Sequence, residues 1–388
     1  MTDVVIIDYN VIKVGEHWDK SLGDLIFEAS YPLIKKYGND EIEALYIGNM
    51  LSEFANIQSN LGAYAADILG LFDIDAFHVN CAEASSSAAI YQAVLAIKSG
   101  RYDVVLAGGV EKMTDLLYRK AVEGLSLALN ADLVRMTGLN LASVAGIMTK
   151  EYIKRYNVTK EMITSISVQD HKNAVNSPHA QYRYEITIDQ AINAPPIADP
   201  LTIYDVTSIS DGGAFLLLAS RKYAEERNLP YIKVLGVGMA INTLSIVDRN
   251  DILEFRATTK ACKKALSEAK INISDVNVYE INDDFSITGI LSLEALGVFG
   301  KGEAAKNVYE GRTALTSDKP INTFGGLKAR GHPVGATGAY QTAEVCMQLM
   351  NKAGSNQVNN AKYGLIQNYG GLDSIAVVMI LGRGDLNA

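Results

Sequence analysis

The sequence predicts an α/β fold built from two related halves. Short segments rich in Val and Ile alternate with segments of helical periodicity, which is typical of a sheet covered by helices on both faces. The order of strand and helix begins again after about residue 220, and a Gly-Gly pair follows a late strand in each half, at 108–109 and 370–371. We therefore expect one half at 1–220, which includes a loop region at about 110–205, and a second half at 221–388.

The individual elements follow from the same periodicity. Strands are expected at 3–8, 45–48, 76–80, 103–108, 212–219, 232–238, 276–281, 363–368 and 374–382. Helices are expected at 21–37, 61–69, 86–99, 139–156, 160–175, 256–269, 285–296 and 336–351. The polar, proline-containing stretch from Asn176 to about Asp205 is long for a loop in a compact domain, and such loops are often functional.

Composition excludes several classes of protein. The net charge of −9 and the lack of a basic run disfavour binding to nucleic acid or to an anionic membrane. The three cysteines lie far apart and form no CxxC pair, so we expect neither a metal site nor a disulfide framework. No signal peptide is visible and the longest apolar runs are only of strand length, which predicts a cytoplasmic protein.

The strongest local signal is the segment GGLKARGHPVGATG at 325–338. Pro333 disfavours the α conformation at His332, and Gly325, Gly326 and Gly331 permit close approach of the backbone to a ligand. His332 is therefore a candidate base or hydrogen-bond donor, with a structural histidine in a sharp loop as the alternative. The sequence has neither GxxxxGK[ST] nor a GxGxxG after a strand, which disfavours nucleotide hydrolysis and dinucleotide binding.

This segment resembles the His-bearing loop of the thiolase superfamily, especially of archaeal and sterol-carrier-type thiolases. The similarity runs end to end and includes YDVVLAGGVEKMTD at 102–115, NSPHAQYRYEIT at 176–187 and VYEINDDF at 278–285. The resemblance implies the thiolase fold, an αβαβα five-layer sandwich of two similar halves, each with a five-stranded mixed sheet. It also implies CoA or acyl-CoA as ligand, no covalently bound cofactor, and a homodimer or dimer of dimers. Some archaeal members work with a small OB-fold, zinc-ribbon partner, which makes such a partner an open expectation here.

The first departure from these relatives concerns the nucleophile. They carry a cysteine in a context like AACASGSAAI, and the ungapped match NCAEASSSAAI at 80–90 places Glu83 at that position. Restoring Cys81 as the nucleophile would require a two-residue gap. A carboxylate is stable at a helix N-terminus, so Glu83 is either a capping group or a functional one. It cannot form a stable thioester.

The second departure concerns the acid/base group. Related thiolases carry His-Asp-Cys-Phe where this chain has Asn282, Asp283, Asp284 and Phe285, so Asp284 takes the place of the acid/base cysteine. Asn368 stands where other thiolases place it. The resemblance implies one oxyanion hole from His332 and Asn282, and a second from the backbone N–H groups of Glu83 and Gly370. Thr207 corresponds to a serine that contacts pantetheine in the family.

Three functions stay open at this point. The first is an acyl-CoA-binding protein of the acetyl-CoA acetyltransferase family with little or no Claisen condensation or thiolysis. The second is altered chemistry through Glu83 and His332, where CoA transfer ranks slightly above decarboxylation because an anionic Glu83 would repel a substrate carboxylate. The third is a non-catalytic scaffold subunit. An open tunnel leading to Glu83 would favour a CoA-ester site, and a plugged one the scaffold.

Overall fold

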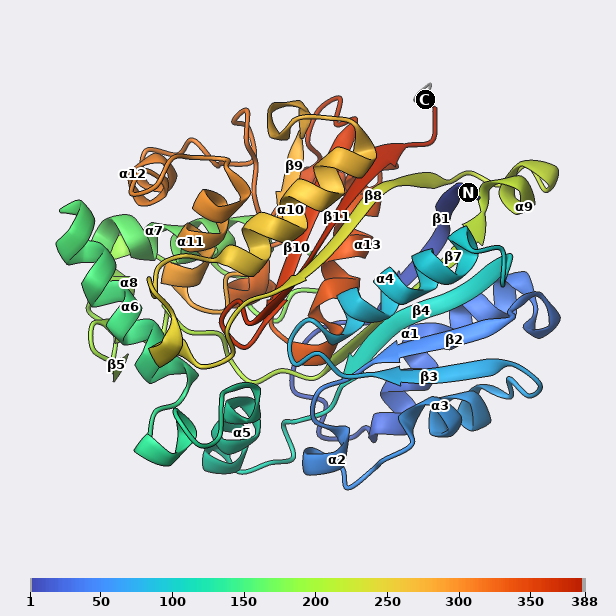
Figure 1. Cartoon of the computed structure of the whole chain (residues 1–388), viewed down its shortest axis with the longest axis horizontal. Coiled ribbons are helices and arrows are strands. Elements are labelled where there is room, and N and C mark those ends of the chain that lie inside the picture. The colour runs from blue at the N-terminus through green and yellow to red at the C-terminus, as the bar shows by residue number, and fades with distance from the viewer. Residues whose placement is uncertain (1, 386–388) are drawn as a thin grey trace.

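The computed structural model describes residues 2–385. Nine strands form one mixed sheet in the order β3-β2-β4-β7-β1-β8-β11-β10-β9 (Figure 1). The strands are β1 (Val4–Val11), β2 (Ala44–Gly48), β3 (Asp75–Val79), β4 (Val104–Glu111), β7 (Gly212–Ser220), β8 (Ile232–Ile241), β9 (Val278–Glu280), β10 (Tyr363–Gly370) and β11 (Ile375–Arg383).

The helices that cover the sheet lie close to their predicted ranges. They are α1 (Leu22–Tyr37), α3 (Leu61–Leu69), α4 (Ser85–Lys98), α6 (Leu141–Tyr156), α7 (Lys160–Ala174), α10 (Arg256–Ala269), α11 (Ser286–Leu296) and α13 (Thr337–Leu349). Shorter helices are α2 (Ser52–Ala55), α5 (Tyr118–Leu125), α8 (Ile188–Ile192), α9 (Arg221–Glu226) and α12 (Ala304–Tyr309). The stretch predicted as a long loop after Asn176 contains α8 and a small two-stranded sheet of β5 (Pro196–Ala198) and β6 (Leu201–Thr202).

The two halves repeat one topology. In the first half, β2 pairs in parallel with β3 and β4, while β7 runs antiparallel to β4 and β1. In the second half, β9 pairs in parallel with β10, and β11 runs antiparallel to β10 and β8. The partner equivalent to β3 is reduced to a single parallel bridge between Tyr279 and Ile321. The second half thus has four strands and a bridge where the resemblance implied five strands.

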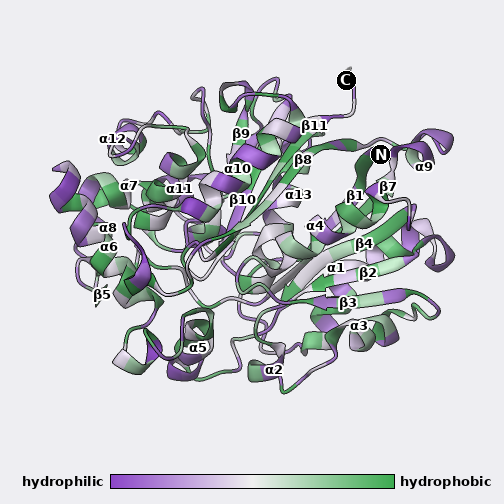
Figure 2. Ribbon diagram, viewed as in Figure 1, coloured by the Kyte–Doolittle hydropathy of each residue, from purple (hydrophilic) through white to green (hydrophobic). Residues whose placement is uncertain are grey.

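Three hydrophobic cores separate five layers. The first core packs α1 and α3 against one face of the first half-sheet, and the third packs α10 and α11 against the outer face of the second. The middle core joins the inner faces of both half-sheets to α4 and α13, which lie between them. Figure 2 shows the hydrophobic residues along the strands, while α10 alternates between hydrophobic and hydrophilic residues. These layers are the αβαβα arrangement of the thiolase fold.

The half-sheets are joined through a short contact. β1 and β8 pair antiparallel at only two positions, Val5 with Lys233 and Ile6 with Ile232. The chain boundary between the halves near residue 220 stays a prediction. Within residues 2–385, no helix is long and apolar enough to cross a membrane.

Candidate active site

Glu83 lies in the turn between β3 and α4, where it points to the other half of the chain. The turn contains Ala82 in the left-handed region, with φ of 53°. The Glu83 side chain is buried, and its Oε2 accepts a hydrogen bond of 2.8 Å from the backbone N–H of Gly371. The expected alternative of a helix cap is wrong, because the N-cap residue of α4 is Ala84 and no side chain caps this helix.

Burial changes the acidity of Glu83. Desolvation, and then the nearby carboxyl group of Asp284, raise the pKa of Glu83 to about 7. Hydrogen bonds from the backbone N–H groups of Glu83 itself and of Gly371 act in the opposite direction. The carboxyl group therefore uses the N–H of Glu83, one of the two donors expected to hold an oxyanion, together with the N–H of Gly371. The expected role of the Gly370 N–H stays a prediction.

Cys81, two residues before Glu83, packs against Gly370 at the end of β10. A side-chain carbon on Gly370 would lie 2.4 Å from the carbonyl oxygen of Cys81, so only glycine allows this approach. Cys81 is half-buried, and burial raises the pKa of its thiol. Its backbone N–H donates to Ser85 Oγ at 2.9 Å. Within the described part of the chain, the surroundings of the Cys81 thiol do not activate it as a thiolate.

His332 is a neutral, oriented donor. It is 5% exposed, and burial together with the charge of Arg330 lowers its pKa to about 3. Its Nδ1 lies 2.7 Å from Thr337 Oγ1, whereas Thr337 Oγ1 lies 3.5 Å from the carbonyl of Pro333. The shorter contact is the better destination for the hydroxyl proton, which leaves the ring proton on Nε2. His332 is thus suited to donate a hydrogen bond and unsuited to act as a base near neutral pH.

The side-chain oxygen of Asn282 accepts a hydrogen bond from a residue of β10. Asn368 Nδ2 donates to Asn282 Oδ1 at 2.6 Å, and the Nδ2 of Asn282 has no hydrogen-bond partner among the described residues. A side-chain carbon on Gly338 would lie 1.9 Å from Ser87 Oγ and 2.9 Å from Asn368 Oδ1. Ser87 stands one helical turn after Glu83, so Gly338 brings the Asn282 pair beside the helix that follows Glu83.

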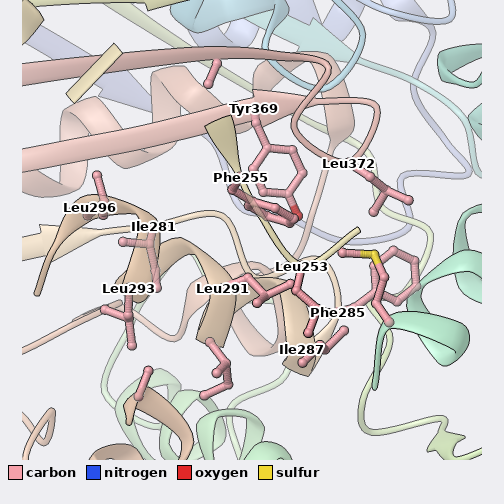
Figure 3. Close-up of a cluster of buried hydrophobic side chains, with 14 of the residues drawn as sticks. Leu253, Phe255, Ile281, Phe285, Ile287, Leu291, Leu293, Leu296, Tyr369 and Leu372 are labelled. Carbon is pink, nitrogen blue, oxygen red and sulfur yellow. The ribbon is translucent and has the colours of Figure 1, made fainter. Parts of the chain in front are cut away.

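Asp284 is buried against an aromatic core. Its Oδ1 accepts hydrogen bonds from the Tyr369 hydroxyl and, at 2.7 Å, from Thr288 Oγ1. Figure 3 shows Tyr369 beside Phe255, and the two ring centroids are 5.4 Å apart. Burial raises the pKa of Asp284 to about 6. Asp284 and Glu83 are therefore two carboxyl groups of raised pKa that repel each other when both are charged.

A cavity of about 430 Å³ opens beside Thr207. Its walls are largely apolar and aromatic, with Trp18 and Tyr118 among them. The backbone N–H of Thr207 donates to the carbonyl of Asp284 at 3.1 Å, which connects the cavity wall to the strand–helix junction of the site.

An apolar cluster links the wall of this cavity to the loops beside Glu83 and His332. Two of its members, Leu116 and Ile209, also line the cavity, whereas Ala82 and Val334 adjoin Glu83 and the His332 loop. Met113 and Met50 complete the contact. Apolar side chains, two of them methionines, therefore connect the wall of the cavity to the loops that carry Glu83 and His332.

The three loop glycines face protein atoms. Gly325, Gly326 and Gly331 have φ of 108°, 54° and 107°, which L side chains rarely adopt. A side-chain carbon on Gly331 would lie 2.4 Å from Val14 Cγ1, and one on Gly325 would lie 2.6 Å from Ala174 Cβ. Packing within the chain thus accounts for these glycines, and their role in ligand binding stays a prediction.

Sequence reasoning missed the residues that orient the site. Glu111, at the end of β4, accepts hydrogen bonds from the N–H groups of Met50, Leu51 and Gly335, and thereby ties the His332 loop to the first half. Thr337 and Gly371 were also missed. All three lie within segments that the sequence analysis singled out, but nothing in those segments showed which side chain or N–H group would orient the site.

Comparison with known proteins decides the family. The family profile for the thiolase N-terminal domain matches residues 4–222, and the one described as thiolase C-terminal domain-like matches residues 238–383. The chain belongs to the thiolase family. It is 37% identical to the acetyl-CoA acetyltransferase of Methanothermobacter thermautotrophicus over 99% of this chain and 100% of that protein.

Other members of the family extend this result. The acetyl-CoA acetyltransferase of Methanocaldococcus jannaschii is 36% identical, over 98% of this chain and 99% of its own. Human sterol carrier protein 2 is 32% identical over 78% of this thiolase-family chain and 57% of its own length. A solved structure of the Ltp2-ChsH2(DUF35) aldolase superposes with a TM-score of 0.84, covering 99% of this chain and 98% of that one at 21% identity, which shows the common fold.

Among residues 2–385, no group of three His, Cys, Asp or Glu side chains could hold a metal ion.

The buried Glu83 predicts a pH-dependent stability. Because the pKa of Glu83 is raised from 4.5 to about 7 in the folded state, the folded protein favours the protonated form. Its contribution to stability is present below about pH 4.5 and is lost as the pH rises through 7, by about 3 kcal/mol. Glu83→Gln should therefore raise the free energy of unfolding at pH 8 more than at pH 5, measured by urea denaturation. Equal effects of Glu83→Gln at both pH values would contradict this expectation. Glu53→Gln, at the exposed start of α2, is the control and should have the same small effect at both pH values.

Proposed function

We propose that this thiolase-family protein binds acyl-CoA thioesters without forming a covalent acyl-enzyme. The observation that carries the proposal is the buried Glu83 carboxyl group on the N–H of Gly371, in the turn where the family resemblance expects a cysteine. Covalent acyl transfer requires an activated nucleophile, and a buried carboxyl group with a pKa raised to about 7 that already accepts a backbone N–H is a poor one. The homologous acetyl-CoA acetyltransferases support CoA thioesters as the ligand class.

Two features of the site support a non-covalent role. Neutral His332 and the unpartnered Nδ2 of Asn282 are donors for a thioester carbonyl oxygen, and both are preorganised by Thr337 and Asn368. The cavity beside Thr207 has aromatic walls that suit a pantetheine arm or an acyl chain. Side chains of the apolar cluster would move aside for the acyl group.

Absence of thiolysis is the first test. Purified protein should cleave acetoacetyl-CoA at a rate indistinguishable from the buffer control, because neither Glu83 nor Asp284 can carry the acyl group as a thioester. Loss of the enolate absorbance of acetoacetyl-CoA measures the reaction. Robust turnover that disappears in Cys81→Ala, and persists in Cys262→Ala, would contradict the proposal and identify Cys81 as the nucleophile.

Ligand binding is the second test. Calorimetry should detect binding of acetyl-CoA to the wild-type protein, and Thr207→Trp should weaken it at least tenfold because the indole fills the cavity. Exposed Thr243→Trp is a matched control that should leave the affinity unchanged. Failure of a folded protein to bind millimolar acetyl-CoA would favour the scaffold function instead.

Decarboxylation is a second candidate function, and the raised pKa of Glu83 favours it over CoA transfer. A neutral Glu83 removes the repulsion expected between this residue and a substrate carboxylate. The bond between the α-carbon and the carboxylate of a malonyl-type thioester would break, and its electron pair would form an enolate stabilised by His332 and Asn282. Glu83 would give its proton to the α-carbon and regain one from water. CoA transfer instead requires an anionic, accessible Glu83.

Decarboxylation makes a separate prediction. Wild-type protein should convert malonyl-CoA to acetyl-CoA and CO₂ with a rate that falls as the pH rises through about 7, the pKa of Glu83. Glu83→Ala should lower the rate at least tenfold by removing the proton donor, and mass spectrometry of the CoA esters measures it. No acetyl-CoA between pH 5.5 and pH 8 would exclude this function and leave binding alone.

Three further expectations stay predictions. They are a homodimer or dimer of dimers, a small OB-fold, zinc-ribbon partner, and a cytoplasmic location. The name of the aldolase with the similar fold includes a DUF35 component, which supports a partner only by analogy of fold.

A further inference from the structure

Three buried polar side chains lie beside the start of the segment that leads to His332, and they have no role in the functions proposed above. Asp170 on α7, Asp283 before α11 and Asn322 are all at most 2% exposed. They surround Gly326, which opens a π-helical turn at Gly326–Arg330. Such turns are rare inside proteins and are frequent near functional sites.

The geometry brings three unsatisfied atoms to one point. A side-chain carbon on Gly326 would lie 2.7 Å from each of Asn322 Nδ2, Asp170 Oδ1 and Asp283 Oδ2. Across the described residues, none of these three buried atoms has a donor or acceptor partner that satisfies ordinary hydrogen-bond geometry. The side chains of Asp170 and Asp283 contact each other at hydrogen-bond range. Since an ionised carboxylate cannot donate, that contact is favourable only with a proton between the two groups.

The orientation of Asn322 argues for a proton and against a cation. Asn322 Oδ1 accepts the backbone N–H of Ile281 at 2.9 Å, so its Nδ2 donor must face the two carboxyl groups. A donor at this position stabilises one negative charge and repels a metal ion. Asp283 Oδ1 accepts a second donor, the N–H of Leu327, at 2.8 Å. These donors fit a pair that carries a single negative charge.

Two cations lie near the pair, and the charge of Arg330 acts against the raised pKa of Asp283, but each cation is also shared with other groups. Lys328 directs its ammonium group to the carbonyls of Ile203 and Val206, and Arg330 lies 3.2 Å from Glu344. Glu280, on β9, adds a further acid that raises the pKa of Asp170.

We propose that Asp170 and Asp283 share one proton and that Asp170 is thereby a positioning residue for the junction that carries Asn282 and Asp284. Asp283 connects this junction to the π-helical turn through Leu327, and the turn leads directly to His332. Loss of the shared proton places two negative charges in contact inside the protein and drives the junction and the loop apart. The inference does not depend on the proposed function.

The test uses substitutions that imitate the protonated acid. Asp170→Asn keeps the size of the side chain and donates to Asp283 at every pH. The pKa of Asp170 is raised well above its usual value, so the stability that it contributes is present at low pH and lost as the pH rises. The wild-type Tm should fall by roughly 2–4 °C more than that of Asp170→Asn between pH 5 and pH 8. Asp373→Asn removes a buried carboxyl group outside the cluster and serves as a control background. Adding Asp170→Asn to Asp373→Asn should change the pH dependence of Tm by the same amount as adding it to the wild type.

Infrared spectroscopy gives a readout that does not depend on stability. At pH 7 the carbonyl stretch of a protonated carboxylic acid should lose intensity in Asp170→Asn relative to wild type, and Asp283→Asn should show the same loss. Parallel Tm curves for wild type and Asp170→Asn, or an unchanged carbonyl band in both variants, would overturn the shared proton. Acyl-CoA binding is measured separately, so its failure would count against the proposed function and not against this inference.

Discussion

The helix α13 and the first turns of α4 beside it have almost no face toward solvent, and the rest of the site depends on this constraint. They lie between two half-sheets, so the polar groups at their N-termini must find partners within the protein. Ser86 Oγ on α4 accepts the N–H of Ala339 on α13 at 3.0 Å, and Gly338 allows the contact with Ser87. Glu83 stands just before α4, His332 stands a few residues before α13, and Asn368 lies beside Gly338 of α13.

Burial at this point sets the chemistry available to the site. Charged forms are costly without solvent, so the pKa of His332 falls to about 3 and that of Glu83 rises to about 7. A neutral imidazole and a carboxyl group near its midpoint favour hydrogen-bond donation and proton transfer over nucleophilic attack. This combination distinguishes the site from one built around an activated thiolate, although the fold is the same.

The cavity beside Thr207 and the buried carboxyl group of Glu83 are separate features of the site. The cavity opens beside Thr207, and the apolar cluster around Met113 and Ile209 links its wall to the turn that carries Glu83. Methionine side chains adapt to new contacts at little cost, so the proposed entry of an acyl group would require no change in the layers of the fold. Glu111 attaches the His332 loop to the first half through the N–H of Gly335.

Local sequence patterns are sufficient to predict the nine strands, the eight long helices and the loops that carry Glu83 and His332, because hydrophobic periodicity and loop motifs are local properties. The groups that these residues contact depend instead on how distant segments pack together. Glu83 reaches Gly371 and not Gly370, and Asp170 meets Asp283, through contacts between segments far apart in the chain. The pKa values follow from the same cause, since desolvation depends on what covers a side chain and periodicity does not reveal it.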